Sequence, residues 1–441
     1  MDKRIKERKD MLFTNIGIID ENFKYSDDMC VGVQADKITY IGKEIPKDSD
    51  AFGERYDGKG KVLMPGFYNA HGHSPMSLLR GYGENLSLHD WLFTRIFPFE
   101  AKLYSKGVYW ATLLTMAESI RFGIVSTTDM YFFLDDMIRA YSVAGTKGNL
   151  SRSVSYSEGD GNVEEMTGYK ESRDAIIMYD GFENGRIKID ACIHAEYTNT
   201  VESMRAIADL AKEFDVRMQV HVSETKKETD ECIERYGKTP TEILNECGAF
   251  DTPTTAAHCV WINENDREIF KTKGITAASN PCSNYKLASG MCDVPALYEK
   301  GVNVAIGTDS VASNNSLNFI EEMKLFAMTG KLKSNDPSKM TPEQVLYSAT
   351  RAGALSQGRD DCGLLKAGYK ADLIAIDVSG VNMAPVHDML NNIIYAADGK
   401  DVCLTMIDGK VCYKDGEFTM IDIEETIAET EKAKDKILSE L

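Results

Sequence analysis

The chain has 441 residues, and because a single hydrophobic core stops growing near ~250–300 residues, we expect two structural units. Hydrophobic residues make up 43% of the chain and charged residues 27%, which is typical of a soluble globular enzyme and excludes a disordered protein. The formal net charge of −19 comes without a basic stripe and argues against nucleic-acid binding, so a small neutral or zwitterionic substrate is favoured.

The N-terminal segment and the cysteines indicate an intracellular location. The first residues, MDKRIKERKDMLF, are basic but lack the apolar core and cleavage site of a signal peptide. No run of about 18 apolar residues follows, so we expect no association with a membrane. The ten cysteines include no Cys-x-x-Cys pair, which is typical of unpaired, mostly buried thiols in a reducing compartment. The sequence therefore predicts a cytoplasmic protein.

Short strands are expected at both ends of the chain. Residues 11–60 and about 361–419 carry alternating runs punctuated by glycine and aspartate, such as KITYIGKEI, ADLIAIDVS and CLTMIDGKVCYKDGEF. Neither segment has enough apolar surface to be stable alone, so we expect them to pair into one small, discontinuous β-sandwich. The last residues, IDIEETIAETEKAKDKILSEL, place Glu and Lys four apart and predict a terminal surface helix. The predicted domains are residues 1–60 with 361–441, and residues 61–360.

The middle of the chain alternates short apolar runs with amphipathic stretches, a pattern typical of parallel strands joined by crossover helices. Eight runs are found: KVLMPGFYNA, GIVSTTDM, NLSRSVSYS, IKIDACIHA, VRMQVHVSE, TTAAHCVW, ITAASNP and VNVAIGTDS. After the fourth, Met204, Ile207, Ala208 and Ala211 form an apolar stripe at helical spacing. Their spread over ~250 residues predicts an α/β fold that closes into a (β/α)8 TIM barrel.

Polar side chains stand where the predicted strands end, and in such barrels the carboxyl ends of the strands carry the catalytic groups. Five of the seven histidines fall at these ends, together with a glutamate and an aspartate: His71, His73, His194, His221, His258, Glu224 and Asp309. Random placement would put about one histidine there. The sequence therefore predicts an enzyme site rather than a chance distribution.

The residue types at these ends suit a divalent metal ion. His71 and His73 are two residues apart, so their imidazoles leave a strand on the same side. An isolated His-x-His is more often a solvent-facing pair, but here His221 and Asp309 accompany it. Three imidazoles and one carboxylate favour Zn²⁺, with Fe²⁺ as an alternative, and leave one position for water. Binuclear hydrolases of this barrel type have a bridging lysine at the end of the fourth strand, and here the fourth strand ends without a suitably placed lysine, so we expect one ion.

Other strand-end groups have the chemistry of proton transfer. Glu224 stands three residues after His221, near enough to exchange protons with water or with a substrate ring; the alternative is a surface glutamate that begins the next helix. His258 and Asp309 would flank the attacking water, and Asp309 would accept its proton. His194 is explained equally well as a buried imidazole or as a substrate contact.

The sequence resembles the amidohydrolase superfamily, specifically the branch of 5′-methylthioadenosine/S-adenosylhomocysteine deaminases, over nearly its whole length. The similarity is carried by PGFYNAHGHSPMSLLRGYGENLSLHDWLF, HVSET, AAHCV, SNPCSNYKLASG, GTDSVASNNSLNFIEEM and GLLKAGYKADLIAID. The resemblance implies metal binding by His71, His73, His221 and Asp309, proton shuttling by Glu224 and transition-state support from His258. It further implies substrate contacts by four residues: Trp91, Glu100, Arg152 and His194.

The resemblance implies a hydrolytic deaminase that converts the adenine ring of a nucleoside to the hypoxanthine form and releases ammonia. Glu100 would bind the ribose diol and Trp91 would form a pocket wall, although ordinary core packing explains Trp91 equally well. One feature departs from the family: its second arginine, expected about twelve residues after Arg152, is replaced near Glu164. A carboxylate there would repel a homocysteine carboxylate, which favours methylthioadenosine, 5′-deoxyadenosine or adenosine over S-adenosylhomocysteine.

Two alternatives remain open at this point. The same metal set would serve hydrolysis of another aminated or chlorinated heterocycle, such as guanine, a pterin or an s-triazine, because fold and ligands do not choose the substrate. A non-catalytic scaffold on the same barrel is a second alternative, disfavoured by the complete ligand set. A homo-oligomer is compatible with the sequence.

Overall fold

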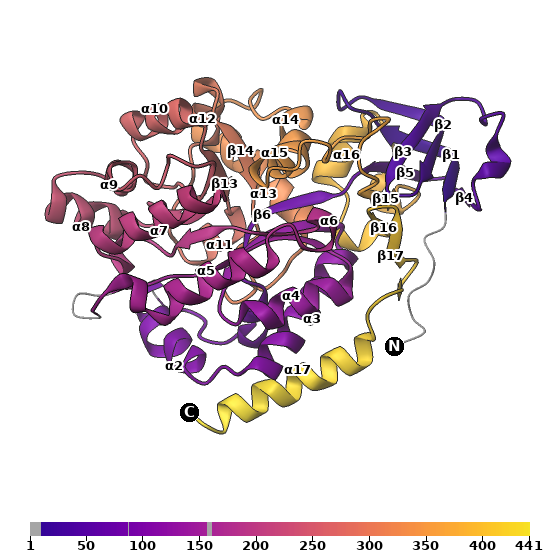
Figure 1. Cartoon of the computed structure of the whole chain (residues 1–441). Helices are drawn as coiled ribbons and strands as arrows, with labels where there is room; N and C mark the ends of the chain where they lie inside the picture. Colours follow the sequence, from indigo (N-terminus) through magenta and orange to yellow (C-terminus); the bar gives the residue numbers. More distant parts are fainter. Residues whose placement is uncertain (1–9, 87, 157–160) are drawn as a thin grey trace.

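Two parallel sheets form the centre of the molecule (Figure 1). The structure is a computed structural model that describes residues 10–86, 88–156 and 161–441; the basic residues 1–9 lie outside this part. The first sheet contains β6 (Phe67–Gly72), β7 (Ile124–Tyr131), β8 (Lys147–Arg152) and β9 (Ile187–Ile189). The second contains β10 (Ala191–Ile193), β11 (Met218–Val222), β12 (Thr254–His258), β13 (Thr276–Ser279) and β14 (Asn303–Ile306). The predicted α/β class is therefore confirmed.

Each of the eight apolar runs contains a strand of these sheets, but two runs are interrupted. The run at 187–195 forms β9 and β10 with Asp190 between them, whose carboxylate accepts hydrogen bonds from Asn149 Nδ2 (3.0 Å) and Gln219 Nε2 (2.9 Å). The run at 61–70 divides into β5 (Lys61–Pro65) and β6. A Cβ at Gly66 would lie 2.3 Å from Val125 Cγ1, so glycine is needed where the chain passes between the two strands.

Helices connect the parallel strands, as the amphipathic stretches predict. In α7 (Val201–Phe214), Met204, Ile207, Ala208 and Ala211 are buried as expected, which confirms the predicted stripe. The other connecting helices are α3 (Ser105–Arg121), α4 (Leu134–Ala144), α5 (Thr167–Tyr179), α8 (Lys226–Tyr236), α9 (Pro240–Glu246), α10 (Glu264–Lys273), α11 (Pro281–Lys286), α12 (Val294–Lys300) and α13 (Phe319–Ser334). Two further helices follow, α14 (Pro342–Ala349) and α15 (Arg351–Ser356).

Strands from both ends of the chain share one nine-stranded sheet beside the parallel sheets (Figure 1). Its strands are β1 (Met11–Ile19), β2 (Tyr25–Gln34), β3 (Lys37–Gly42), β4 (Glu54–Asp57), β5, β15 (Leu373–Asp377), β16 (Val402–Ile407), β17 (Lys410–Lys414) and β18 (Glu417–Phe418). The two ends meet where β5 pairs antiparallel with β15. The strands are linked as a single sheet because β1 pairs with β4 through its first half and with β5 through its second. The two-layered arrangement of a sandwich stays a prediction.

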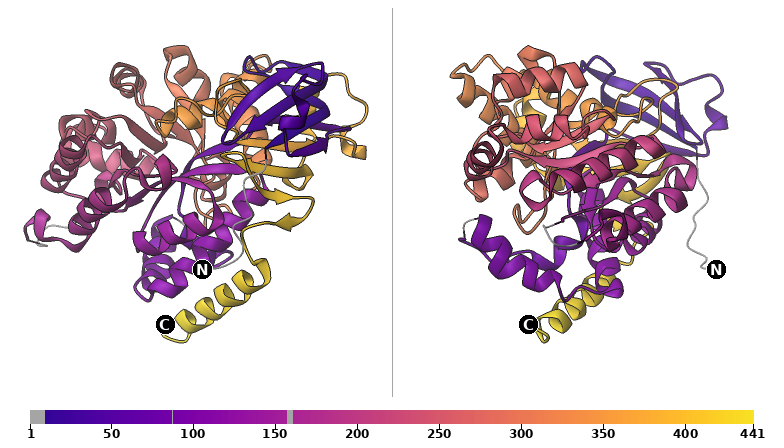
Figure 2. Two further views of the ribbon diagram at one scale, coloured as in Figure 1. Left: turned by 45° about the vertical axis from the view of Figure 1, so that its right-hand side comes forward. Right: turned by 60° about the vertical axis from the view of Figure 1, so that its left-hand side comes forward.

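The predicted terminal helix is present as α17 (Ile423–Leu438), which projects from the last strands along the edge of the molecule (Figure 2). It packs on α3, where Glu429 pairs with Lys106 at 2.6 Å and Thr430 Oγ1 donates to Trp110 O at 3.2 Å. The last helix therefore contacts the part of the chain that carries the parallel sheets. None of the helices in the described ranges is long and apolar enough to cross a membrane.

A buried ion cluster joins the terminal sheet to the first parallel sheet. Lys147 begins β8, its side chain is 3% exposed, and its ammonium pairs with Asp372 and, at 2.8 Å, with Asp408 Oδ1. Tyr68 Oη donates to Asp372 Oδ2 at 2.5 Å, and Asp408 N donates to Asp372 Oδ1 at 2.8 Å. The cluster is therefore satisfied only when both sheets are in place.

Lys147→Met is expected to lower the free energy of unfolding by roughly 3–5 kcal/mol, because it leaves the Asp372 carboxylate buried without its cation. Denaturant unfolding followed by fluorescence measures the change. Lys226→Met is the matched control, since Lys226 pairs with Asp230 at 2.5 Å but is 62% exposed, and such a pair contributes under about 1 kcal/mol. Equal effects of the two substitutions would contradict the role given to the buried cluster.

Candidate active site

A pocket opens at the carboxyl ends of the parallel strands, where the sequence places its polar residues. Four of the histidines predicted at strand ends line it together with one glutamate: His73, His194, His221, His258 and Glu224. Asp309 lines the same pocket, and His71 lies directly behind it, fully buried. His258 and Asp309 have positive φ values of 73° and 57°, a left-handed conformation that non-glycine residues adopt at a cost and most often at functional sites.

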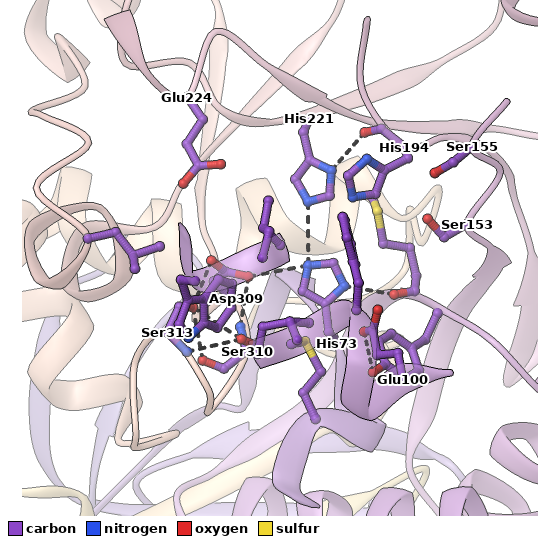
Figure 3. A pocket seen from close by; sticks show the side chains of 18 of the residues that line it. His73, Glu100, Ser153, Ser155, His194, His221, Glu224, Asp309, Ser310 and Ser313 are labelled. Carbon is purple, nitrogen blue, oxygen red and sulfur yellow. Dashed lines mark hydrogen bonds and ion pairs between the residues drawn. The ribbon is translucent and has the colours of Figure 1, made fainter. Parts of the chain in front are cut away.

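The four predicted metal ligands lie close together, and Figure 3 shows three of them, His73, His221 and Asp309, directed toward one another. The ligand atoms of His71, His73 and His221 lie within 4.8 Å of one another, and so do those of His71, His258 and Asp309. Asp309 Oδ1 is 3.3 Å from His73 Nε2 and 3.5 Å from His71 Nε2, and His221 Nε2 is 3.4 Å from His73 Nε2. A divalent ion placed among these atoms would be reached by three nitrogens and one oxygen.

The hydrogen bonds around the cluster leave its inner atoms free to bind a metal. His73 Nδ1 faces Met130 O at 2.7 Å and His221 Nδ1 faces His194 O at 2.7 Å, so both rings donate outward and turn Nε2 inward, as metal-ligating histidines do. His71 Nε2 is buried without a hydrogen-bond partner. Burial lowers the pKa of His71 to about 3 and holds the imidazole neutral, which is the form that binds metal. The donor set therefore fits a divalent ion of the zinc type.

The carboxylate of Asp309 is held in place by hydroxyl groups of α11 and of the segment after β14. Ser283 Oγ donates to Asp309 Oδ2 at 2.5 Å, Ser313 Oγ at 3.0 Å, and Ser310 N donates to Oδ1 at 2.8 Å. Burial would raise the pKa of Asp309, but the imidazoles of His71 and His73 hold it well below its usual range. Asp309 is therefore an anion with one oxygen fixed by hydroxyls and the other directed at the histidines.

Glu224 and His258 face each other on one side of the pocket, with Glu224 Oε2 3.8 Å from His258 Nε2. Asn284 Oδ1 lies 2.8 Å from His258 Nδ1 and turns Nε2 toward the cavity. Ser289 Oγ donates to Glu224 Oε1 at 3.2 Å. Burial raises the pKa of the Glu224 carboxyl, which brings a proton carrier closer to neutral pH.

On the opposite side of the histidines stands Glu100 (Figure 3). It ends a helical segment composed of α1 (Leu88–Trp91), the π-helical turn η3 (Leu92–Ile96) and α2 (Phe97–Glu100). Tyr131 Oη donates to Glu100 Oε1 at 2.5 Å, and burial raises the pKa of Glu100 to about 7. Trp91, which is 6% exposed, lines the pocket from the same segment.

The remaining predicted substrate contacts are placed differently from one another. His194 lines the pocket, with Nδ1 2.9 Å from Thr198 Oγ1. Arg152 ends β8 just beside the pocket, but its Nε donates to Glu171 Oε2 at 2.5 Å and its guanidinium lies over Phe132. Glu164, near the position of the missing arginine, lies in a short exposed helical turn. The structure thus does not bring Arg152 among the side chains that line the pocket.

Several polar side chains that contact the site have no role in the sequence interpretation. They are Tyr131, Ser283, Asn284, Ser289 and Ser313, which position Glu100, Asp309, His258 and Glu224. Ser283, Asn284 and Ser289 lie in the run SNPCSNYKLASG, and Ser313 in GTDSVASNNSLNFIEEM. A signal was available, because both polar runs directly follow predicted strands.

Glu228 and Glu322 are buried carboxylates behind the site. Glu228 accepts the backbone N–H groups of Ser223 (2.9 Å) and Glu224 (2.8 Å) and so holds the end of β11. Glu322 accepts Asn314 Nδ2 at 2.5 Å and Cys282 N at 3.2 Å. Both glutamates fall on helices outside the strand ends, where the sequence gives no reason to single them out.

Comparison with known proteins agrees with this arrangement. Residues 62–412 match the model of the amidohydrolase family. The 5-methylthioadenosine/S-adenosylhomocysteine deaminase of Caldanaerobacter subterraneus subsp. tengcongensis is 36% identical over 97% of this chain and 98% of its own length. The 5′-deoxyadenosine deaminase of Methanosarcina mazei is 37% identical over 93% of each chain.

Solved structures show the same fold. An adenosine deaminase from Xanthomonas campestris with bound zinc superposes with a TM-score of 0.91 and 28% identity, over 98% of this chain and 99% of its own. Atrazine chlorohydrolase from Arthrobacter aurescens superposes with a TM-score of 0.88 at 22% identity, over 96% of this chain and 100% of its own, a likeness of fold alone. On the family match and the two curated relatives together, the chain belongs to the amidohydrolase family.

Proposed function

We propose that this amidohydrolase hydrolytically deaminates the adenine ring of a nucleoside, with 5′-methylthioadenosine, 5′-deoxyadenosine, adenosine or S-adenosylhomocysteine as substrate. The observation that carries the proposal is the composition of one pocket. It holds a metal-ligand set, a buried Glu224–His258 pair on one side, and the half-buried carboxyl of Glu100 on the other. The metal-ligand set and the Glu224–His258 pair therefore match a ring that is hydrolysed, and Glu100 matches a sugar that is bound.

His71, His73, His221 and Asp309 would hold one divalent ion, with zinc preferred over iron. When bound, such an ion lowers the pKa of water and supplies a nucleophile at neutral pH. Among the described residues that line the pocket there is no lysine, which supports a single ion.

The chain's own groups move the protons. A water molecule adds to the ring carbon that carries the amine, and Asp309 accepts the proton that the water loses. Glu224, whose pKa is raised by burial, gives a proton to the adjacent ring nitrogen, and His258 Nε2 is placed to contact the oxygen that has added. The amine takes up the proton held by Asp309 and leaves as ammonia, and the hydroxyl that has added returns a proton to Glu224, so that the ring is left in the hypoxanthine form and both carboxyl groups are restored.

Glu100 is assigned to the ribose diol. Its Oε1 accepts a hydrogen bond from Tyr131 Oη, and its other oxygen would bind the sugar hydroxyls. Trp91 and His194 would pack against the nucleoside from two sides of the pocket. A bare base offers no hydroxyl to Glu100, so this residue separates a nucleoside deaminase from an enzyme of guanine, pterin or s-triazine hydrolysis.

Ammonia release from a panel of compounds tests the function. Adenosine, 5′-deoxyadenosine and 5′-methylthioadenosine are expected to be turned over much faster than adenine, guanine, cytosine and a chlorinated s-triazine. A higher kcat/KM for any of the bare rings than for all of the nucleosides would overturn the proposal.

Glu100→Ala is expected to lower kcat/KM for the best nucleoside roughly 10- to 100-fold, because hydrogen bonds from two hydroxyls to a carboxylate are lost. Turnover of adenine, which lacks the sugar, provides the internal control and is expected to stay at the level of the unsubstituted enzyme. Unchanged activity on nucleosides would remove Glu100 from the binding site.

Three structural features belong to the same proposal. The parallel sheets are inferred to close into a (β/α)8 barrel, supported by Asp309 N donating to His71 O at 3.0 Å and by the bridge between Val154 and Ile193. Residues 61–360 are inferred to form the hydrolase unit, and residues 1–60 with 361–441 the β-sandwich unit. A cytoplasmic enzyme that binds neither nucleic acid nor membrane, and that can form a homo-oligomer, remains the expectation from the sequence.

A further inference from the structure

The charges around the pocket are unbalanced. Three carboxylates line it, those of Glu100, Glu224 and Asp309, and the described lining residues include no lysine or arginine. Apart from the divalent ion proposed among the histidines, an anionic group on a substrate would therefore meet acidic side chains and no cationic side chain among the described lining residues. The guanidinium of Arg152 is one cationic group beside the pocket, because its neighbour Ser153 lines the pocket directly.

Arg152 is committed to other contacts. Its Nε donates to Glu171 Oε2 at 2.5 Å, its guanidinium carbon lies 4.6 Å from the centre of the Phe132 ring, and its Nη1 donates to Ser153 O. The guanidinium also lies against Gly168, where an added Cβ would be 3.7 Å from Arg152 Cζ. Phe132 lines the pocket, so Arg152 packs against a residue of the pocket wall. The charge of its guanidinium is paired with the Glu171 carboxylate.

We propose that Glu171 determines which 5′ substituents the enzyme accepts, by holding Arg152 in an ion pair and so selecting for uncharged tails. The inference rests on the proposed function, because it concerns the tail of the nucleoside bound in the same pocket. A tail that ends in a carboxylate has to compete with the Glu171 carboxylate for the same guanidinium. An uncharged tail gains its contact from the Phe132 ring and from the serines at this side and loses nothing.

Glu171 suits a substitution test because it stands on α5 with its side chain 50% exposed, so its replacement is compatible with folding. Glu171→Gln removes the charge and keeps the shape. The measurement is kcat/KM for two nucleosides that share the ring, the ribose and the sulfur: the tail of S-adenosylhomocysteine ends in an amino acid with a carboxylate and an ammonium group, and that of 5′-methylthioadenosine ends in a methyl group.

The expected result is a rise of about tenfold in the ratio of kcat/KM for S-adenosylhomocysteine to kcat/KM for 5′-methylthioadenosine. The value for 5′-methylthioadenosine itself is expected to change less than about twofold. Because the two hydroxyls of the ribose and the ring are common to both substrates, a change in the ratio reports on the tail alone.

Glu165→Gln is the matched control. Glu165 is an exposed glutamate six residues before Glu171, and it pairs with Lys170 at 2.6 Å rather than with Arg152. Neutralising Glu165 changes the local charge by the same amount as neutralising Glu171. If Glu171 acts through its contact with Arg152, the kcat/KM ratio does not shift in Glu165→Gln. In the double variant Glu171→Gln/Arg152→Gln the ratio is expected to return to that of the unsubstituted enzyme, since the released guanidinium is absent.

The role of Glu171 and the proposed function are contradicted by different results. An unchanged ratio in Glu171→Gln, or an equal rise in Glu165→Gln, would overturn the role of Glu171 while 5′-methylthioadenosine is still deaminated. Failure of the unsubstituted enzyme to deaminate 5′-methylthioadenosine or any other nucleoside would instead overturn the proposed function.

Discussion

Glu224→Gln is expected to lower kcat for nucleoside deamination by roughly 10²- to 10⁴-fold, the usual contribution of a positioned general acid or base. Glutamine has the shape of glutamate and can keep the hydrogen bond from Ser289 Oγ, which lies 3.2 Å from Glu224 Oε1. It cannot give a proton to the ring nitrogen. The loss should therefore appear in kcat rather than in KM, measured by steady-state ammonia release.

Two further variants separate chemistry from structure in this experiment. Glu231→Gln changes an exposed glutamate on the helix that follows Glu224 and is expected to leave kcat unaltered. Asp309→Asn is expected to lose activity as well, but together with bound metal, because Asp309 is assigned both roles. A kcat within a few-fold of normal in Glu224→Gln, with unchanged circular dichroism, would refute Glu224 as the proton carrier.

The order of elements and the position of the site could be predicted because both follow from local pattern. Apolar runs with polar ends define the strands, and parallel strands bring their carboxyl ends to one side. Their places at strand ends thus bring His71, His73, His221 and Asp309 to one side of the sheets, but His194 and His258 share such places, and the family resemblance separates the ligands from them. The apolar stripe of α7 was predictable for the same reason, since burial of one helix face follows from its spacing.

Contacts between distant segments could not be read from the sequence. The run at 61–70 looks continuous, yet it divides because β5 finds its partner in β15, about 310 residues later. Whether Arg152 enters the pocket depends on Glu171, a surface glutamate that no motif distinguishes. Likewise, Ser283 and Ser313 meet Asp309 only because α11, which follows β13, and the segment after β14 converge, which is a property of tertiary structure.

Removal of the divalent ion is expected to abolish deamination, and addition of zinc to the chelated protein is expected to restore it. The buried Nε2 of His71, which has no hydrogen-bond partner, and the inward-facing Nε2 atoms of His73 and His221 would hold the ion. Elemental analysis of the protein as purified is expected to give about one equivalent of metal, because the site has three imidazoles and one carboxylate.

His73→Ala removes one of the four ligands and is expected to lower both the bound metal and kcat/KM by at least ~10–100-fold, since even partners of ligands contribute that much to metal affinity. His387→Ala, at an exposed histidine outside the site, is the control and should retain both metal and activity. Equal metal content in the two variants would place the ion elsewhere. A native protein without metal or activity that zinc does not reactivate would instead support a non-catalytic scaffold, because a site of this composition has no other evident means of activating water.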